Sequence, residues 1–146
     1  MTGWDVDWRA VARGALVGFS VIVPVTVLHA VLDHEIRDFD DSGWRSVLYL
    51  FILGGFLAAG WVAGRLREDT PFMHGTFAAT GALVLWIPAR IVIWAAREDD
   101  RGLISGKDAA LRPGQLFVTL LIAVSLGMFG AWLGARLVAR ARSSEG

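Results

Sequence analysis

The sequence predicts an all-α integral membrane protein with four transmembrane helices arranged as two antiparallel hairpins. Hydrophobic residues make up 55% of the 146 residues, and the mean hydropathy of +0.52 is high for a soluble domain. The apolar residues form four blocks, each long enough to cross a hydrocarbon core of about 30 Å. Short charged segments separate these blocks, so neighbouring helices are expected to run antiparallel within a single transmembrane domain, residues 1–146.

Charge and cysteine content narrow the classes of function. The 14 basic and 14 acidic residues cancel, whereas a nucleic-acid-binding face requires an excess of positive charge. The absence of cysteine excludes disulfides, thiolate metal ligands and cysteine nucleophiles. We therefore expect a lipid bilayer as the surrounding partner, no nucleic acid, and no cofactor or metal.

The four spans follow from the lengths of the apolar blocks and from the turn signals between them. They are predicted at residues 8–32, 44–66, 72–96 and 114–138. Thr70 and Pro71 fit the N-cap and first helical position of the third span. The loop before the fourth span allows a short helix around Lys107–Leu111, and the short polar tail 139–146 is expected to be disordered.

Small residues recur every four positions, most densely around the turn between the second and third spans. This spacing lets helix backbones approach closely in lipid, as in a glycine zipper. The glycines predicted to pack against other helices are Gly14, Gly18, Gly54, Gly55, Gly60, Gly64, Gly75, Gly81, Gly127, Gly130 and Gly134. The pattern is compatible with packing within one chain and with packing between copies of the chain.

The two hairpins share short sequence similarities. The second span ends in GWVAGRL and the fourth in GAWLGARL, while Arg13-Gly14 and His74-Gly75 open the first and third spans. These similarities are compatible with a 2+2 internal repeat, and also with a chain in which glycine, alanine and arginine are simply common.

The distribution of charge predicts the orientation in the membrane. The side that holds both termini would carry seven arginines, and the other side would carry six basic residues. Nine of the 14 acidic residues fall in the loops at 33–43 and 97–113. Because basic residues favour the cytoplasmic side, we predict a multi-pass protein of a bacterial inner membrane with both termini in the cytoplasm.

Three polar residues are candidates for function. Arg90 lies six residues before the end of the third span, about 9 Å deep at 1.5 Å per residue, where an arginine is a functional hypothesis by default. It could instead extend to the headgroups or pair with Asp33 or Glu35. His29 and Asp33 share a helix face and could bind a metal or relay a proton, or be ordinary interfacial residues.

The segment AGRLREDTPFMHG, residues 63–75, resembles the hairpin of a group of uncharacterised small bacterial four-span membrane proteins. In that group the second span ends in an AGR-like exit and the third begins with HG. The resemblance implies an integral membrane protein and brings no catalytic residues with it.

Because the sequence contains no catalytic constellation, we expect a protein that is not an enzyme. The favoured hypothesis is an assembly or packing partner of another membrane protein, or a homo-oligomer. The alternative is a small oligomeric transporter or channel that uses Arg90 near the outer leaflet. An intramembrane enzyme would need two titratable groups at depth, and only Arg90 and His29 qualify.

Overall fold

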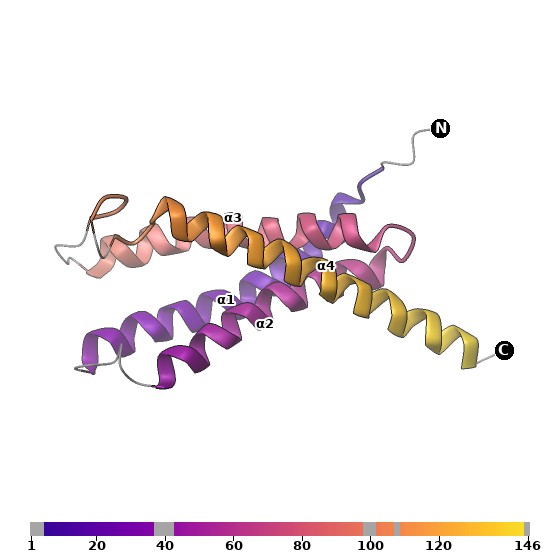
Figure 1. Ribbon diagram of the computed structural model, residues 1–146, viewed down its shortest axis with the longest axis horizontal. Helices are drawn as coiled ribbons and strands as arrows, with labels where there is room; N and C mark the ends of the chain where they lie inside the picture. Colours follow the sequence, from indigo (N-terminus) through magenta and orange to yellow (C-terminus); the bar gives the residue numbers. More distant parts are fainter. Residues whose placement is uncertain (1–4, 37–42, 98–101, 107–108, 145–146) are drawn as a thin grey trace.

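The computed structural model describes residues 5–36, 43–97, 102–106 and 109–144. The helices are α1 (Trp8–Glu35), α2 (Gly43–Leu66), α3 (Pro71–Arg97) and α4 (Pro113–Ser144) (Figure 1). All four are long and apolar enough to cross a membrane. Even the shortest, α2, has 24 residues and is about 36 Å long. The chain is a four-helix membrane protein, as the sequence predicts.

The helices form a bundle in which α2 and α3 separate α1 from α4. Both outer helices pack on α2 and on α3, and no contact joins α1 to α4 over the described residues. Both termini lie at one end, which we call the terminal end (Figure 1). At the opposite end, which we call the cavity end, α1 and α3 finish and α2 and α4 begin. There the α1–α2 pair diverges from the α3–α4 pair (Figure 1).

Small side chains fill the interior, and large apolar side chains face outward. Six of the ten buried residues in the core cluster are alanines. Leu50, Val92 and Phe117 are each more than 60% exposed. Such a surface would be costly in water, but in a bilayer small residues belong at helix contacts and large apolar residues can face lipid.

Most of the predicted packing glycines lie at helix–helix contacts within the chain. At every one of them except Gly54, an added Cβ atom would contact another helix. The closest approaches are between Gly60 and the Gly127 backbone and between Gly64 and the Ala131 backbone. Gly54 differs from the prediction, because a Cβ there would meet no atom within 4 Å. Adjacent helical residues point about 100° apart, so Gly54 faces outward when Gly55 faces α1.

The two hairpins repeat one contact pattern. In each, a glycine near the start of the first helix meets two small residues four positions apart on the second helix. The contacts are Gly14 with the Ala59 carbonyl and Ala63 Cβ, and Gly75 with the Gly127 carbonyl and Ala131 Cβ. The match agrees with the sequence pairing of Gly14 with Gly75, although the 2+2 repeat stays a prediction. The bundle as a whole is not symmetric, because α2 contacts α3 whereas described residues of α1 and α4 do not meet.

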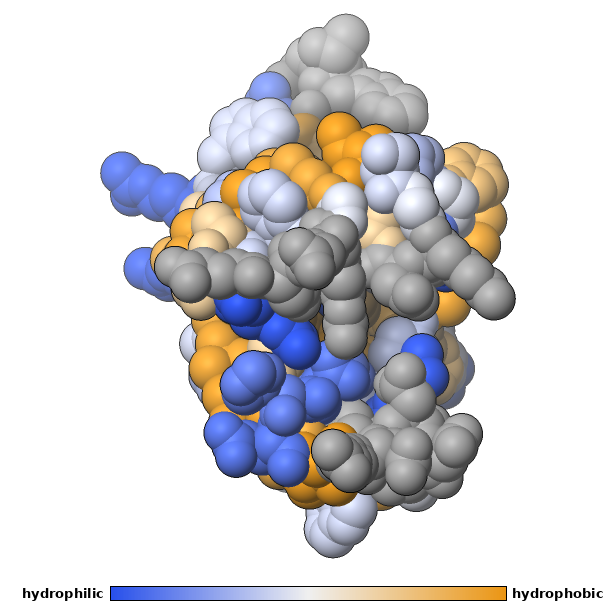
Figure 2. Space-filling model, turned by 90° about the vertical axis from the view of Figure 1, so that its left-hand side faces the viewer, coloured by the Kyte–Doolittle hydropathy of each residue, from blue (hydrophilic) through white to orange (hydrophobic). Residues whose placement is uncertain are grey.

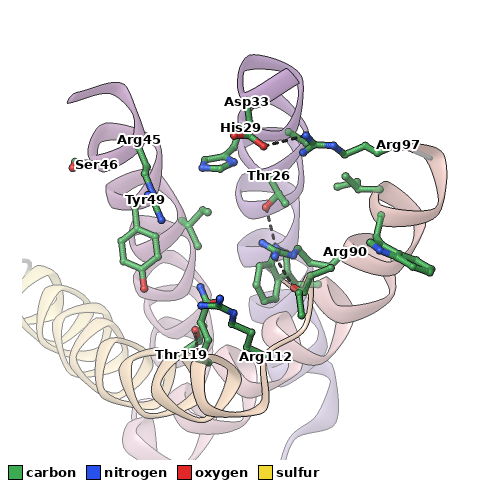
Figure 3. A pocket seen from close by; sticks show the side chains of 18 of the residues that line it. Thr26, His29, Asp33, Arg45, Ser46, Tyr49, Arg90, Arg97, Arg112 and Thr119 are labelled. Atoms are coloured by element: carbon green, nitrogen blue, oxygen red, sulfur yellow. Dashed lines mark hydrogen bonds and ion pairs between the residues drawn. The ribbon is translucent and has the colours of Figure 1, made fainter. Parts of the chain in front are cut away.

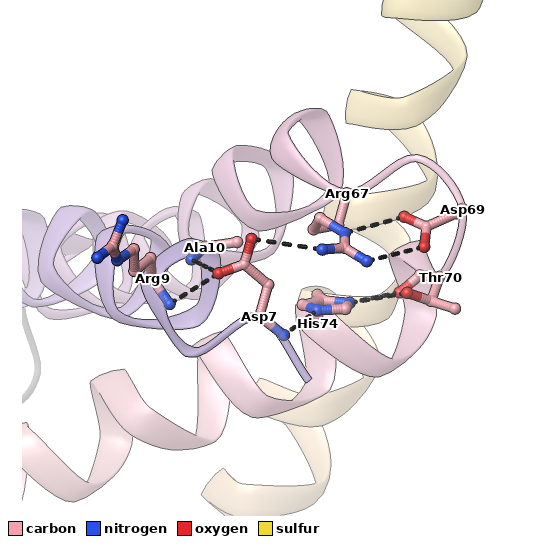
Figure 4. Close-up of polar contacts among 7 residues, drawn as sticks. All are labelled: Asp7, Arg9, Ala10, Arg67, Asp69, Thr70 and His74. Atoms are coloured by element: carbon pink, nitrogen blue, oxygen red, sulfur yellow. Dashed lines mark hydrogen bonds and ion pairs between the residues drawn. The ribbon is translucent and has the colours of Figure 1, made fainter. Parts of the chain in front are cut away.

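A polar contact joins the start of α1 to α3 at the terminal end (Figure 4). The Asp7 carboxylate caps α1 by accepting the backbone N–H groups of Arg9 and Ala10 at 3.0 and 3.2 Å. The backbone N–H of Asp7 donates to Nε2 of the fully buried His74 at 2.9 Å. Nδ1 is therefore the protonated ring nitrogen, and it donates to the Thr70 carbonyl at 2.9 Å. These bonds make His74 a structural residue.

Arg67 connects this contact to the turn between α2 and α3 (Figure 4). Its guanidinium pairs with Asp69 at 3.0 Å and with Asp7 at 3.5 Å. The hydrogen bond from Arg67 holds the pKa of Asp69 below its ordinary value. The pKa of Asp7 is also lowered, first by the N–H of Ala10 and then by the N–H of Arg9 and the charge of Arg67.

Three further predictions concern the start of α3, the end of α4 and the loop before α4. Thr70 and Pro71 precede and begin α3 as predicted. The tail was expected to be disordered, but α4 continues to Ser144, because alanine and arginine favour helix and Arg142 pairs with Glu68 at 2.9 Å. The helix allowed around Lys107–Leu111 is not formed at residues 109–111, and positions 107–108 lie outside the described residues.

Candidate functional site: an arginine-lined cavity

A cavity of about 750 Å³ opens at the cavity end, where the two helix pairs diverge (Figure 3). All four helices line it, together with the segment 109–112 that leads into α4. The volume falls within the range of small-molecule sites in proteins. The small residues that draw the helices together lie nearer the terminal end, so the divergence that creates the cavity follows from their placement.

The lining of the cavity is strongly cationic. Its charged residues are Asp33, Arg45, Arg90, Arg97 and Arg112. Guanidinium groups stay charged at any physiological pH, so among the described lining residues four cations stand beside one carboxylate. Figure 2 looks onto this end, where hydrophilic residues gather across the middle of the face and apolar residues flank them.

Arg90 lies within the cavity, seven residues before the end of α3, about 10 Å along the helix. Its guanidinium lies over the Trp86 ring, 5.0 Å from the centroid. One nitrogen donates to the Ala110 carbonyl at 2.6 Å. Within the described part of the chain it contacts no carboxylate, so the ion pair with Asp33 or Glu35 considered from the sequence is not formed.

Two local contacts hold Arg90 and its surroundings in place. The buried Thr26 accepts a hydrogen bond from Trp86 Nε1 at 2.9 Å, which fixes the indole beneath the guanidinium. Thr26 in turn donates to the Ile22 carbonyl at 2.8 Å. Across the cavity, the buried side chains of Ala109 and Leu111 anchor the segment that carries the Ala110 carbonyl.

The same segment places Arg112 in the cavity. Backbone hydrogen bonds from Ala110 to Gly102 and from Leu111 to Leu103 fold the chain back on itself immediately before α4. Figure 3 shows Arg112 beside Thr119, with its side chain directed into the space between the helices. Like Arg90, it has no carboxylate partner among the residues that the structure describes.

Asp33 and His29 lie on the α1 wall of the cavity (Figure 3). The Asp33 carboxylate pairs with Arg97 of α3 at 3.0 Å, with both side chains largely buried. This ion pair ties α1 to α3 at the cavity end. Over the described residues, no group of three or more His, Cys, Asp or Glu side chains is placed to hold a metal ion.

The three candidates named from the sequence, Arg90, His29 and Asp33, line one cavity. Sequence reasoning counted Arg45, Arg97 and Arg112 only as loop charges. The sequence does place these arginines at the same end of a four-span protein as Arg90. The loops at 33–43 and 97–113 also carry nine acidic residues, so the charge count alone does not indicate an arginine-lined cavity.

Chemically, this arrangement suits binding better than catalysis. Over the described residues, Arg90 and Arg112 contact no carboxylate, and arginines do not transfer protons near neutral pH but donate up to five hydrogen bonds each to an anion. The site therefore defines a four-helix membrane protein with a cationic cavity. Comparison of the chain with protein-family models, curated proteins and solved structures gave no match, so the functional argument rests on the cavity itself.

Proposed function

We propose that this protein is not an enzyme and binds an anionic ligand at Arg90 and Arg112, as the binding unit of a small transporter or carrier. The observation that carries the proposal is that both arginines line one cavity and, over the described residues, neither contacts a carboxylate. A guanidinium held in apolar surroundings without a counter-charge is costly. An anion bound between the two would remove that cost and could accept a bidentate pair of hydrogen bonds from each.

The assembly-partner hypothesis has less support. It was based on the glycines that recur every four positions. At all of these predicted glycines except Gly54, an added Cβ would contact another helix of the same chain. Contacts within one chain therefore explain the spacing of these glycines without a second subunit. A homo-oligomer stays a prediction, which the mass of the solubilised protein would test.

We also propose that the cavity end faces outward and the terminal end faces the cytoplasm of a bacterial cell. At the terminal end, Arg65 lies 4.7 Å from the Trp61 ring and Arg136 lies 4.2 Å from the Trp132 ring. Pairs of tryptophan and arginine are typical anchors at a membrane interface. Their position supports a headgroup interface at this end, and the arginine count favours the cytoplasmic leaflet.

A cysteine-protection experiment tests the proposed anion site, because the native chain has no thiol. Ala30 lines the cavity, so Ala30→Cys would be labelled by a small water-soluble methanethiosulfonate reagent in phosphatidylcholine nanodiscs. Two anions serve as probes, inorganic phosphate in the buffer and phosphatidic acid in the bilayer. We expect at least one of them to slow labelling of Cys at position 30 about tenfold or more.

Arginine variants show whether protection depends on the proposed residues. In the background of Ala30→Cys, replacing Arg90 and Arg112 together by Gln should abolish protection. The matched control replaces two exposed arginines of the terminal end, Arg13 and Arg140, by Gln and should leave it intact. If neither anion protects, or if the Arg90→Gln, Arg112→Gln variant is protected equally well, the proposal is wrong.

A further inference from the structure

We infer that the ligand is a membrane amphiphile, with a phosphate or carboxylate head group bound by Arg90 and Arg112 and a hydrocarbon chain lying along the apolar wall. This inference rests on the proposed anion site and adds the class of ligand. It follows from how polar and apolar groups are distributed along the cavity and from which of its sides are closed.

The cavity has a polar mouth and an apolar floor. Arg45 lies near the mouth, and Phe56, on the same helix, lines the floor and is fully buried. The two are 11 residues apart, about 16 Å along the helix axis, so the cavity extends from the end of the bundle well into its interior. Ile52 extends this apolar wall between them.

The polarity of the cavity matches that of a lipid in the adjacent leaflet. A lipid holds its charged group at the membrane surface and its chain toward the midplane. The cavity likewise carries its arginines toward the end of the bundle and Phe56 toward its middle. An amphiphile could therefore move from the leaflet into the cavity without turning over.

The two sides of the cavity differ in how they are closed. On the α1–α3 side, the Asp33–Arg97 ion pair at 3.0 Å and the Trp86–Thr26 hydrogen bond at 2.9 Å join the helices. On the α2–α4 side, the close glycine contacts lie nearer the terminal end, from Leu57 and Gly127 onward. Leu50 lines the cavity and is also 65% exposed, so the wall of the cavity on α2 continues onto the lipid-facing surface.

A free inorganic anion fits these features less well. It would satisfy the arginines but would leave the apolar floor without an apolar partner. A hydrocarbon chain occupies that floor and makes dispersion contacts along it. The charge of the mouth and the character of the floor are thus both matched only by a molecule that has a head group and a chain.

The test uses the Ala30→Cys protein in phosphatidylcholine nanodiscs that contain increasing fractions of phosphatidic acid with the same acyl chains. We expect phosphatidic acid to slow labelling at least tenfold, with no effect of 10 mM inorganic phosphate. Both lipids bring the same chain, so a difference between them measures the head group. Ser143→Cys, exposed at the terminal end, should be labelled at the same rate in all samples.

A variant of the apolar wall tests the chain separately from the head group. Ile52→Phe adds volume beneath the arginines and should reduce protection by phosphatidic acid at least fivefold. Val92→Phe, at an outward-facing position of α3 that is 66% exposed, is the control. In this variant phosphatidic acid should protect the cysteine at position 30 as strongly as it does without the substitution.

The outcomes separate this inference from the proposed function. Protection by inorganic phosphate as strong as that by phosphatidic acid, with dependence on Arg90 and Arg112, would overturn the amphiphile and leave the anion site standing. Absence of protection by either probe would overturn both. If position 30 is labelled in an uncharged detergent but not in phosphatidylcholine alone, phosphatidylcholine, which also has a phosphate and acyl chains, occupies the cavity, as the inference expects. If it is labelled in neither, the cavity is closed to solvent and both proposals are wrong.

Discussion

The terminal half and the cavity end of this bundle are built from the same four helices by opposite means. In the terminal half, backbones touch at positions such as Gly60 and Gly127, and small side chains take up the remaining space. At the cavity end the helix pairs diverge (Figure 1), and long polar side chains such as Arg90 and Arg97 extend into the space between them. Hydrogen bonds and ion pairs occur in both halves, but over the described residues only the terminal half also has close contacts between helix backbones.

This difference suggests that the terminal half provides most of the stability and that the cavity end provides the binding site. Close packing leaves no room for a ligand, and a cavity gives up the dispersion contacts that packing would provide. The terminal half can therefore hold the helices together while the cavity end keeps open volume lined by polar side chains. We expect substitutions in the first region to affect folding and substitutions in the second to affect binding, which the following predictions test.

The largest effect is expected from adding one methyl group in the terminal half. In Gly60→Ala, the new Cβ would overlap the backbone of Gly127, and the helices would have to move apart. We expect a loss of about 1–3 kcal/mol, typical of overpacking, seen as a lower unfolding temperature in detergent. Gly54→Ala makes the same change where a Cβ meets nothing within 4 Å and should be neutral. Equal effects of the two variants would contradict the claim that close backbone contacts stabilise the terminal half.

A smaller effect is expected from removing a hydrogen bond at the cavity end. Thr26→Val keeps the shape of the side chain but removes the acceptor for Trp86 Nε1. Interhelical hydrogen bonds in membranes contribute about 0.6 kcal/mol on average, so the unfolding temperature should fall less than in Gly60→Ala, with a change in tryptophan fluorescence. Ser125→Ala removes an exposed hydroxyl bonded within its own helix and should change neither measurement. A larger loss in Thr26→Val than in Gly60→Ala would contradict the division proposed here.

The smallest effect is a dependence of stability on pH, which should arise at the terminal end. The pKa values of Asp7 and Asp69 lie below their ordinary value of 3.8, so their ionised forms favour the folded state. This contribution is complete above the ordinary pKa and is lost as the pH falls through the lowered values. The unfolding temperature of the native protein should therefore fall between pH 6 and pH 3.

Asp7→Asn isolates this contribution, because asparagine also caps helices but carries no charge. Its unfolding temperature should be lower than that of the native protein at pH 6 and should change less on acidification. Asp5→Asn, at an exposed position before the helix, is the control and should follow the native curve. Parallel curves for Asp7→Asn and the native protein would show that the Asp7 charge does not stabilise the fold.

Three residues of the candidate site could be predicted from the sequence, but its other arginines and the pairing of its charges could not. Arg90 was identifiable because an arginine deep in an apolar span is unusual, and His29 and Asp33 because they share a helix face. Arg112 could not be assigned, since its position depends on the fold of residues 102–111 and on hydrogen bonds to Gly102 and Leu103. The partner of Asp33 was also unpredictable, because Arg90 and Arg97 are seven residues apart and share one face of α3, so only the position of α1 along α3 selects Arg97.

By itself, the sequence determined that this chain forms four membrane-crossing helices and that glycine brings them together. Both properties depend on local features, namely the length of an apolar block and the spacing of small residues. The tertiary structure alone decided that Gly54 faces outward, that α4 extends to Ser144, and that arginines from three separate segments share one cavity. These outcomes depend on how each helix is rotated and how far the pairs diverge, which is settled by contacts between residues far apart in the chain.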